Sequence, residues 1–273
     1  MVSALSSYVG AGIAVRMFDR VDPLGVVWWR LVGAAVVLVA WRRPWKHSWT
    51  RRQAFTAIVF GLVTALLNTF FYLAIHELPL GTAVAIEFSG PIAVGFATAR
   101  NRRNLMSLCV GALGVVLLAG LEFRASRWGL VFIFAAATFW AGYILLGKRV
   151  ADGGAGLDGL ALGIAASVAL LAPVELPSAL DAFDAGSSVV LLCLAIGVLS
   201  TVIPYGLDQM VLAEIGTARF AVLLAILPAT GALLGAVMLA QLPSLLGVVG
   251  ILLVIAAVAI REPTPVPLVE IAE

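Results

Sequence analysis

Residues 68–91 read NTFFYLAIHELPLGTAVAIEFSGP and contain the pattern that decides the fold. An apolar run ends at His76 and Glu77, a Leu-Pro step follows, and a second apolar run continues to Pro91. An apolar run of about 20 residues is long enough to cross a bilayer as a helix. The stretch therefore predicts two membrane-spanning helices joined by a tight hairpin, with Glu87 and Pro91 inside the second helix.

The composition of the whole chain agrees with this stretch. The 273 residues are 62% hydrophobic and 12% charged, whereas soluble domains are ~45–50% apolar and ~25% charged. So few charges cannot form the polar surface of a soluble fold, and we expect an all-α integral membrane protein. A nucleic-acid-binding protein and a separate soluble domain are excluded. Cys109 and Cys193 lie inside apolar runs and indicate neither a disulfide nor a metal site; no cofactor is expected.

Polar breaks divide the chain into ten candidate spans. Their expected limits are 1–17, 24–41, 54–76, 80–99, 105–121, 128–147, 158–176, 187–210, 217–239 and 244–260. Basic residues in short loops stay on the cytoplasmic side of a membrane. With the N-terminus in the cytoplasm, twelve of the 17 basic residues lie on the inner side and four on the outer side, and Arg30 lies within the second span. We therefore expect both termini in the cytoplasm and a disordered tail over 262–273.

The order of elements in the first half recurs in the second. Residues 197–218, GVLSTVIPYGLDQMVLAEIGTA, resemble residues 61–83 and precede a span with an internal proline, as the first copy does. Spans 1, 3 and 4 then correspond to spans 6, 8 and 9, so the repeat has five helices and its second copy is inverted. We expect the first repeat at 1–122 and the second at 127–261. Inverted repeats are typical of secondary transporters, which bind their substrate at the repeat interface.

The first span is shorter than its counterpart in the second repeat. Seven residues precede Tyr8, whereas twelve residues of the sixth span precede Trp140. We expect a truncated first helix or a start at an internal Met; a thin, tilted first helix is the alternative.

Residues 68–91 resemble the fourth-span signature of the EamA branch of the drug/metabolite transporter superfamily, and more narrowly that of the bacterial threonine/homoserine exporters. The runs FWAGYILLGKR at 139–149 and LSTVIPY at 199–205 are similar to the same group. The resemblance extends from about Ser6 to Ile260. It implies ten helices in two inverted five-helix repeats, a bacterial inner-membrane location, and export of small amino acids or related metabolites without ATP.

The chain departs from that group in its second repeat. Leu227 precedes Pro228 and Ala240-Gln241 follows the ninth span, whereas related exporters commonly carry an acidic residue at both places. The resemblance is therefore weakest as a guide to the substrate.

Two charged residues lie inside predicted spans. A charge in the hydrocarbon region costs ~2.5–3.5 kcal/mol on insertion scales, so each one is a functional hypothesis by default. Glu87 and Arg30 lie at similar depths in the fourth and second spans. Glu87 is interpreted as a titratable or cation-contacting group in a substrate cavity. The alternatives are a structural Glu87–Arg30 ion pair that never meets substrate, or an Arg30 side chain that reaches outward to the interface.

Several polar and aromatic residues could line the same pathway. Asn68 in mid-span must bond another helix or line water, and Asp208 lines the inner end of the eighth span or pairs with Arg219. Aromatic rings can surround an ammonium group or form an interfacial belt; these are Tyr72, Trp140, Tyr143 and Tyr205. Prolines inside spans are hinges or packing kinks; these are Pro91, Pro204 and Pro228.

The leading hypothesis is an exporter of small amino acids or related metabolites, linked to protons and working by alternating access. The alternatives are an exporter of another drug or metabolite class on the same fold, and a lipid flippase or scaffold. An integral-membrane enzyme is disfavoured, because the sequence holds two histidines and no Ser/His/Asp set or acidic metal cluster. The expected partners are a small-molecule substrate, protons and the lipid bilayer, without nucleic acid. The Gly111–Gly114 and Gly247–Gly250 pairs leave a homodimer open.

Overall fold

The computed structural model of the chain describes residues 2–98, 101–122, 126–204 and 226–260. These ranges are helical with short turns, and no strand occurs in them, which confirms the expected all-α class. The α-helices are α1 (Val2–Met17), α2 (Pro23–Arg42), α3 (Arg51–Glu77), α4 (Leu80–Glu87), α5 (Ser89–Thr98), α6 (Arg102–Glu122), α7 (Arg127–Asp152), α8 (Gly156–Asp181), α9 (Ser187–Gly197), α11 (Ile226–Leu239) and α12 (Leu245–Ile260). A 3₁₀ segment, η1 (Pro44–Lys46), follows α2, and a π segment, η2 (Val198–Val202), extends α9.

The fourth predicted span is divided in two. α4 ends at Glu87, one helical turn before Pro91, and α5 begins at Ser89. Proline has no backbone N–H and clashes with the carbonyl four residues earlier, which here belongs to Glu87. The proline of the opening stretch thus explains why the helix divides at the position of the buried acid.

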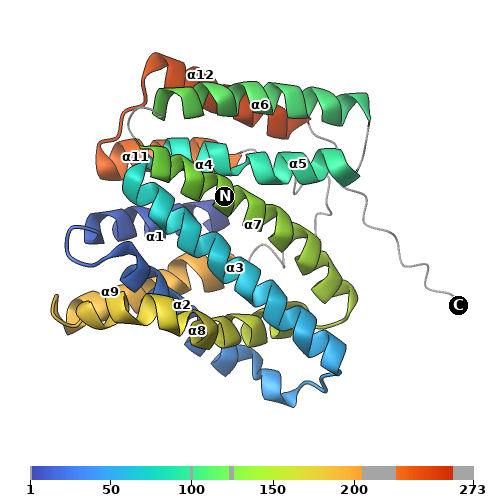
Figure 1. Cartoon of the computed structure of the whole chain (residues 1–273), viewed down its shortest axis with the longest axis vertical. Helices are drawn as coiled ribbons and strands as arrows, with labels where there is room; N and C mark the ends of the chain where they lie inside the picture. The colour runs from blue at the N-terminus through green and yellow to red at the C-terminus, as the bar shows by residue number, and fades with distance from the viewer. Residues whose placement is uncertain (1, 99–100, 123–125, 205–225, 261–273) are drawn as a thin grey trace, which may run out of the picture.

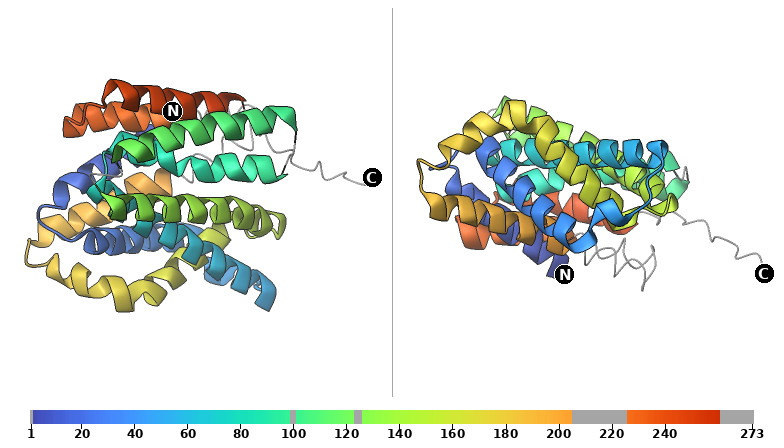
Figure 2. Two further views of the ribbon diagram at one scale, coloured as in Figure 1. Left: turned by 45° about the horizontal axis from the view of Figure 1, so that its top comes forward. Right: turned by 90° about the horizontal axis from the view of Figure 1, so that it is seen from below.

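The helices of the bundle pack around α3 (Figure 1 and Figure 2). α3 lies against both α7 and α8, α2 lies against α8, and α6 pairs with α12 at one end of the molecule. Gly61 on α3 meets Gly163 on α8 so closely that a Cβ atom at Gly61 would lie 2.0 Å from the Gly163 carbonyl carbon. Small residues let helix backbones approach in this way. The α3–α8 interface is therefore a direct backbone contact.

Much of the outer surface is apolar. Large apolar side chains are exposed on the helices at the edge of the bundle, among them Val36, Val116, Leu191 and Val237. Five helical segments in the described part of the chain are long and apolar enough to cross a membrane: 23–42, 51–77, 80–97, 127–150 and 156–181. This surface fits a lipid environment, because apolar side chains can then face acyl chains instead of water.

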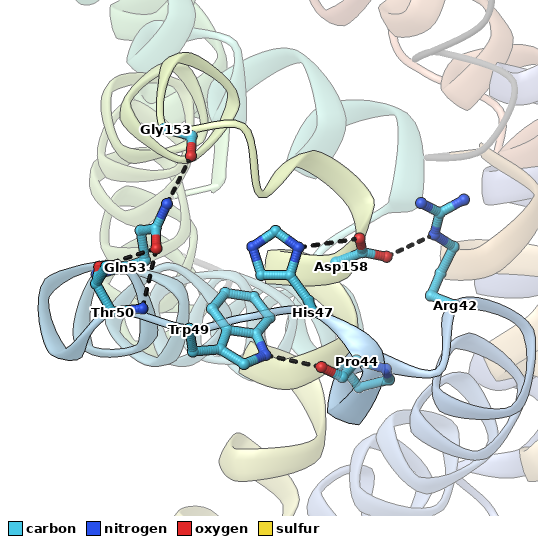
Figure 3. Close-up of polar contacts among 8 residues, drawn as sticks. All are labelled: Arg42, Pro44, His47, Trp49, Thr50, Gln53, Gly153 and Asp158. Carbon is cyan, nitrogen blue, oxygen red and sulfur yellow. Dashed lines mark hydrogen bonds and ion pairs between the residues drawn. The ribbon is translucent and has the colours of Figure 1, made fainter.

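The loop between α2 and α3 is fastened to the turn between α7 and α8 (Figure 3). Arg42 Nε lies 2.8 Å from Asp158 Oδ1, and His47 Nδ1 lies 3.8 Å from Asp158 Oδ2. Gln53, which also completes the capping box of α3, donates from Nε2 to the Gly153 carbonyl at 3.0 Å. We call this partly exposed set the loop clasp; it joins the two predicted repeats at one end of the bundle.

Candidate functional site

Arg30 lies in the middle of α2 on the face that packs inward. Its neighbours on this face, Val26, Val27 and Leu31, are fully buried, and Arg30 itself is 3% exposed. Nη2 donates to the Ser200 carbonyl at 3.0 Å, while Nε and Nη1 are buried without a hydrogen-bond partner among the described residues. The guanidinium therefore keeps unused donors inside the protein, and Arg30 does not reach outward to an interface.

The carbonyl that holds Arg30 is free because of a nearby proline. Pro204 cannot donate to the carbonyl of Ser200 in an α-helix, or to that of Leu199 in a π-helix, and both carbonyls lie in η2. The Leu199 carbonyl instead accepts from Ser6 Oγ at 2.6 Å, and the Ser200 carbonyl accepts from Arg30. π segments are frequent at functional sites. This one places the Leu199 and Ser200 carbonyls against α1 and α2.

Glu87 is the second buried charged residue of the site. It ends α4, is 7% exposed, and forms no hydrogen bond or ion pair with any described residue. Arg30 is near enough to act electrostatically on its carboxyl group. The structural Glu87–Arg30 ion pair that the sequence suggested is therefore not formed, since Arg30 is held by Ser200. The two side chains lie near one another and remain unpaired.

Aromatic rings surround these two groups at different levels. The guanidinium carbon of Arg30 lies 4.9 Å from the centroid of the Tyr72 ring, a distance at which a cation and a ring attract. Trp140 packs edge-on against Phe88, the residue after Glu87, with centroids 4.8 Å apart. Tyr143 instead stacks on Phe60 at 5.2 Å, twelve residues and hence ~18 Å along α3 from Tyr72.

Comparison with known proteins places the chain in a family. The EamA-like transporter family matches residues 127–261. The chain is 31% identical to the threonine/homoserine exporter RhtA of Salmonella typhimurium (strain LT2) over 260 residues, which cover 94% of this chain and 88% of the relative. It is 32% identical to RhtA of Escherichia coli (strain K12) over 246 residues, which cover 88% and 82% of the two chains. The chain belongs to the EamA-like transporter family.

A solved crystal structure supports the same architecture for this EamA-like transporter. It superposes with a TM-score of 0.51 at 16% sequence identity and covers 94% of both chains. At that identity the likeness concerns the fold alone. The resemblance stated from residues 68–91 is confirmed by the family match and by both relatives, which are transporters by name.

Of the other predicted site residues of this EamA-like transporter, some are buried in the described helices and others lie outside the described residues. Asn68 is buried, and its Nδ2 donates to the Thr64 carbonyl of its own helix at 2.7 Å; whether it lines a water-filled pathway stays a prediction. Pro228 lies buried near the start of α11. Tyr205 and Asp208, as well as Arg219, lie outside the described residues.

Sequence reasoning missed a third buried ionisable residue in this EamA-like transporter. Glu175 of α8 is 1% exposed and lies 2.7 Å from Thr69 Oγ1 on α3. It stands one residue before the predicted end of its span, but α8 continues to Asp181. An acidic residue in the apolar run LLAPVELPSAL was the available signal.

No group of three metal-ligating side chains occurs within the ranges that the structure describes.

Proposed function

We propose that the chain is a secondary transporter that exports small amino acids of the threonine/homoserine type, or related metabolites, across the bacterial inner membrane. Two relatives that match most of the chain are named threonine/homoserine exporters, and the exposed surface suits a bilayer. The observation that carries the choice of substrate is a buried guanidinium and a buried carboxyl group that lie near one another but form no ion pair, Arg30 and Glu87.

A free amino acid complements this arrangement. Its carboxylate suits Arg30, whose Nε and Nη1 have no partner among the described residues, because the planar guanidinium binds carboxylates through paired donors. Its ammonium group suits the carboxyl group of Glu87. Two buried charges of opposite sign are costly while they remain separate, and a zwitterion lying between them would satisfy both.

The surrounding side chains would shape the site. Tyr72 holds the guanidinium from one side, and Trp140 covers the turn that carries Glu87. Asn68 turns its amide nitrogen back into α3, which leaves its oxygen for substrate. In the second repeat Tyr205 and Asp208 would line the other end of the pathway, and Tyr143 the region beside Phe60.

The same site accounts for a link to protons. A carboxyl group that binds either a proton or the substrate ammonium, but not both, exchanges one for the other as access alternates. Entry of a proton at Glu87 would then release the amino acid outside. The repeats at 1–122 and 127–261 would rock against one another, with Pro91, Pro204 and Pro228 as the hinges.

Another drug or metabolite class on the same fold is the second candidate. Related exporters commonly carry an acidic residue where this chain has Ala240-Gln241, and here Gln241 Oε1 accepts from the Leu80 N–H at 2.8 Å at the start of α4. This position caps a helix here, so its side chain is not available to a substrate. A lipid flippase or scaffold is the remaining alternative.

Counterflow in proteoliposomes tests the proposal directly. Vesicles loaded with unlabelled threonine or homoserine should accumulate the labelled amino acid when they hold the wild-type protein. Arg30→Gln should abolish accumulation, while Arg42→Gln, which removes an exposed basic residue of the loop clasp, should preserve it. Counterflow of threonine that survives Arg30→Gln in a folded protein would contradict the proposed site.

Both termini are proposed to lie in the cytoplasm, as the distribution of basic residues predicts. A reporter enzyme that is active only in the cytoplasm, fused after Ile260, should be active, and a reporter that needs the periplasm should be silent. A periplasmic signal at this position would contradict the orientation and the inverted repeat together.

A further inference from the structure

The interface between α3 and α8 contains a polar contact that the proposed transport site does not use. Glu175 and Thr69 face one another there, 1% and 7% exposed, with Glu175 Oε1 and Thr69 Oγ1 2.7 Å apart. Glu175 Oε2 is buried without a partner among the described residues. Pro173 and Pro177 flank Glu175 on α8 but are exposed, and Glu175 is the buried residue within 173–177.

The hydrogen atoms at this contact can be counted. Thr69 Oγ1 lies within hydrogen-bond distance of two acceptors, Glu175 Oε1 at 2.7 Å and the Ala65 carbonyl at 3.0 Å. A hydroxyl group carries one hydrogen, and it can serve only one of them. If Glu175 is ionised, one of the two short contacts joins oxygen atoms with no hydrogen between them. If Glu175 carries a proton on Oε1, it donates to Thr69, and Thr69 donates onward to Ala65.

Charge at this place would also be uncompensated. No ion pair or hydrogen bond joins Glu175 to a charged or titratable residue of the described elements that pack against α8. Those residues are Asp22, Arg30, Arg42 and Arg43 around α2, Lys46 on η1, Arg51, Arg52, Tyr72, His76 and Glu77 on α3, and Arg127, Tyr143, Lys148 and Arg149 on α7. A lone carboxylate in an apolar interior is far more costly than a neutral carboxyl group.

We propose that Glu175 is a proton-binding site of the α3–α8 interface, separate from Glu87. In the packed arrangement its carboxyl group holds the proton and donates to Thr69. When the helices separate and water enters, the proton passes from Oε1 to water. The Thr69 hydroxyl then turns to the carboxylate, and the Ala65 carbonyl loses its side-chain donor.

The position links this proton to the geometry of the transport site. Thr69 lies three residues before Tyr72, and so one helical turn away from the ring that contacts Arg30. On the other side, Trp29 Nε1 donates to the Ala179 carbonyl of α8 at 2.8 Å, and Trp29 precedes Arg30 on α2. A separation of α3 from α8 at this level would therefore move Tyr72 relative to Arg30.

Infrared spectroscopy of the full-length protein in liposomes at neutral pH tests this inference without any transported molecule. A protonated carboxyl group has a C=O stretching band that a carboxylate and an amide lack. Glu175→Gln should remove one such band from the wild-type spectrum, because glutamine keeps the size and a donor toward Thr69 but cannot hold a titratable proton. Asp181→Asn, which changes an exposed acid on the same helix, should leave the band in place.

Thr69→Val identifies the band independently and covers the case in which Glu175→Gln does not assemble. Valine has nearly the shape of threonine but accepts no hydrogen bond, so the band of Glu175 should shift to higher frequency. A band from Glu87 should neither shift in Thr69→Val nor disappear in Glu175→Gln. The inference is overturned if Glu175→Gln removes no carboxyl band, or if every carboxyl band stays unshifted in Thr69→Val. If the wild-type protein shows no threonine counterflow while the carboxyl bands behave as expected, the transport proposal is overturned and the inference about Glu175 stands.

Discussion

Glu87 and Glu175 are both acidic residues buried in this membrane protein, yet their surroundings are opposite. Glu87 lies near a guanidinium and forms no hydrogen bond with a described residue, whereas Glu175 contacts a hydroxyl group and no cation. The first arrangement leaves a carboxyl group without a hydrogen-bond partner among the described residues and open to a cationic ligand. The second is satisfied once the carboxyl group is neutral. Burial alone therefore does not tell a group that can bind a charged ligand from one that holds only a proton; the nearest partner does.

The helices that carry the two acids differ in the same way. α4 ends at Glu87, and the chain divides there because of Pro91. Glu175 lies inside the continuous helix α8, which is pressed against α3 at the Gly61–Gly163 contact. A divided helix can turn its end toward a ligand, but a close helix crossing holds its side chains in place.

The largest expected effect comes from forcing α3 and α8 apart. Gly61→Leu would place a side chain 2.0 Å from the Gly163 backbone, so the helices must separate and the Glu175–Thr69 contact must break. We expect a loss of ~3 kcal/mol or more, measured as a large fall in melting temperature in detergent. Gly142→Ala is the matched control, because its Cβ would meet only a Val63 methyl group at 3.2 Å. Equal melting temperatures for the two variants would contradict the close crossing.

A second prediction concerns the carbonyl groups freed by Pro204. Ser6→Ala removes the donor to the Leu199 carbonyl, which is partly buried, so the loss should lie at or below the ~1–3 kcal/mol of a fully buried carbonyl without a partner. We expect a moderate fall in melting temperature, with substrate counterflow retained because Arg30 keeps its own bond to Ser200. Thr56→Ala, which removes an exposed bond within one helix, should have little effect. A fall of similar size in Thr56→Ala would contradict the idea that the donor to the Leu199 carbonyl contributes more stability than an exposed bond within one helix.

The smallest effect is expected at the loop clasp. Its Arg42–Asp158 pair is partly exposed, and such pairs contribute ~0–1 kcal/mol. Asp158→Asn should lower the melting temperature only slightly, and less at high salt, because salt screens exposed charges. A fall comparable to that of Gly61→Leu would show that the clasp, and not the helix crossing, holds the two halves together.

The sequence predicted the helices well because apolar runs and polar breaks are local signals. Each of the ten predicted ranges overlaps a helix in its described part, and the limits of α1, α2 and α12 agree within one residue. The same reasoning set Arg30 and Glu87 apart from the remaining charges, because a charge in mid-span stands out in any apolar run.

The sequence does not predict which group each buried ionisable side chain contacts. Arg30 could have paired with Glu87, but the carbonyl freed by Pro204 is nearer, and only the packing of α2 on η2 decides between them. Glu175 was missed because its partner Thr69 lies 106 positions away. A threonine inside an apolar helix is common and does not by itself predict a polar contact. The inverted repeat and the hinge roles of the prolines stay predictions.

The central claim is that Glu87 exchanges a proton for the substrate while Glu175 does not. The most direct measurement is threonine uptake driven by a pH gradient in proteoliposomes, with wild type, Glu87→Gln and Glu175→Gln compared beside a melting curve for each. Glu87→Gln should lose uptake driven by the gradient while exchange of labelled for unlabelled threonine persists, and Glu175→Gln should keep the gradient dependence. Normal dependence on the pH gradient in a well-folded Glu87→Gln protein would contradict the account.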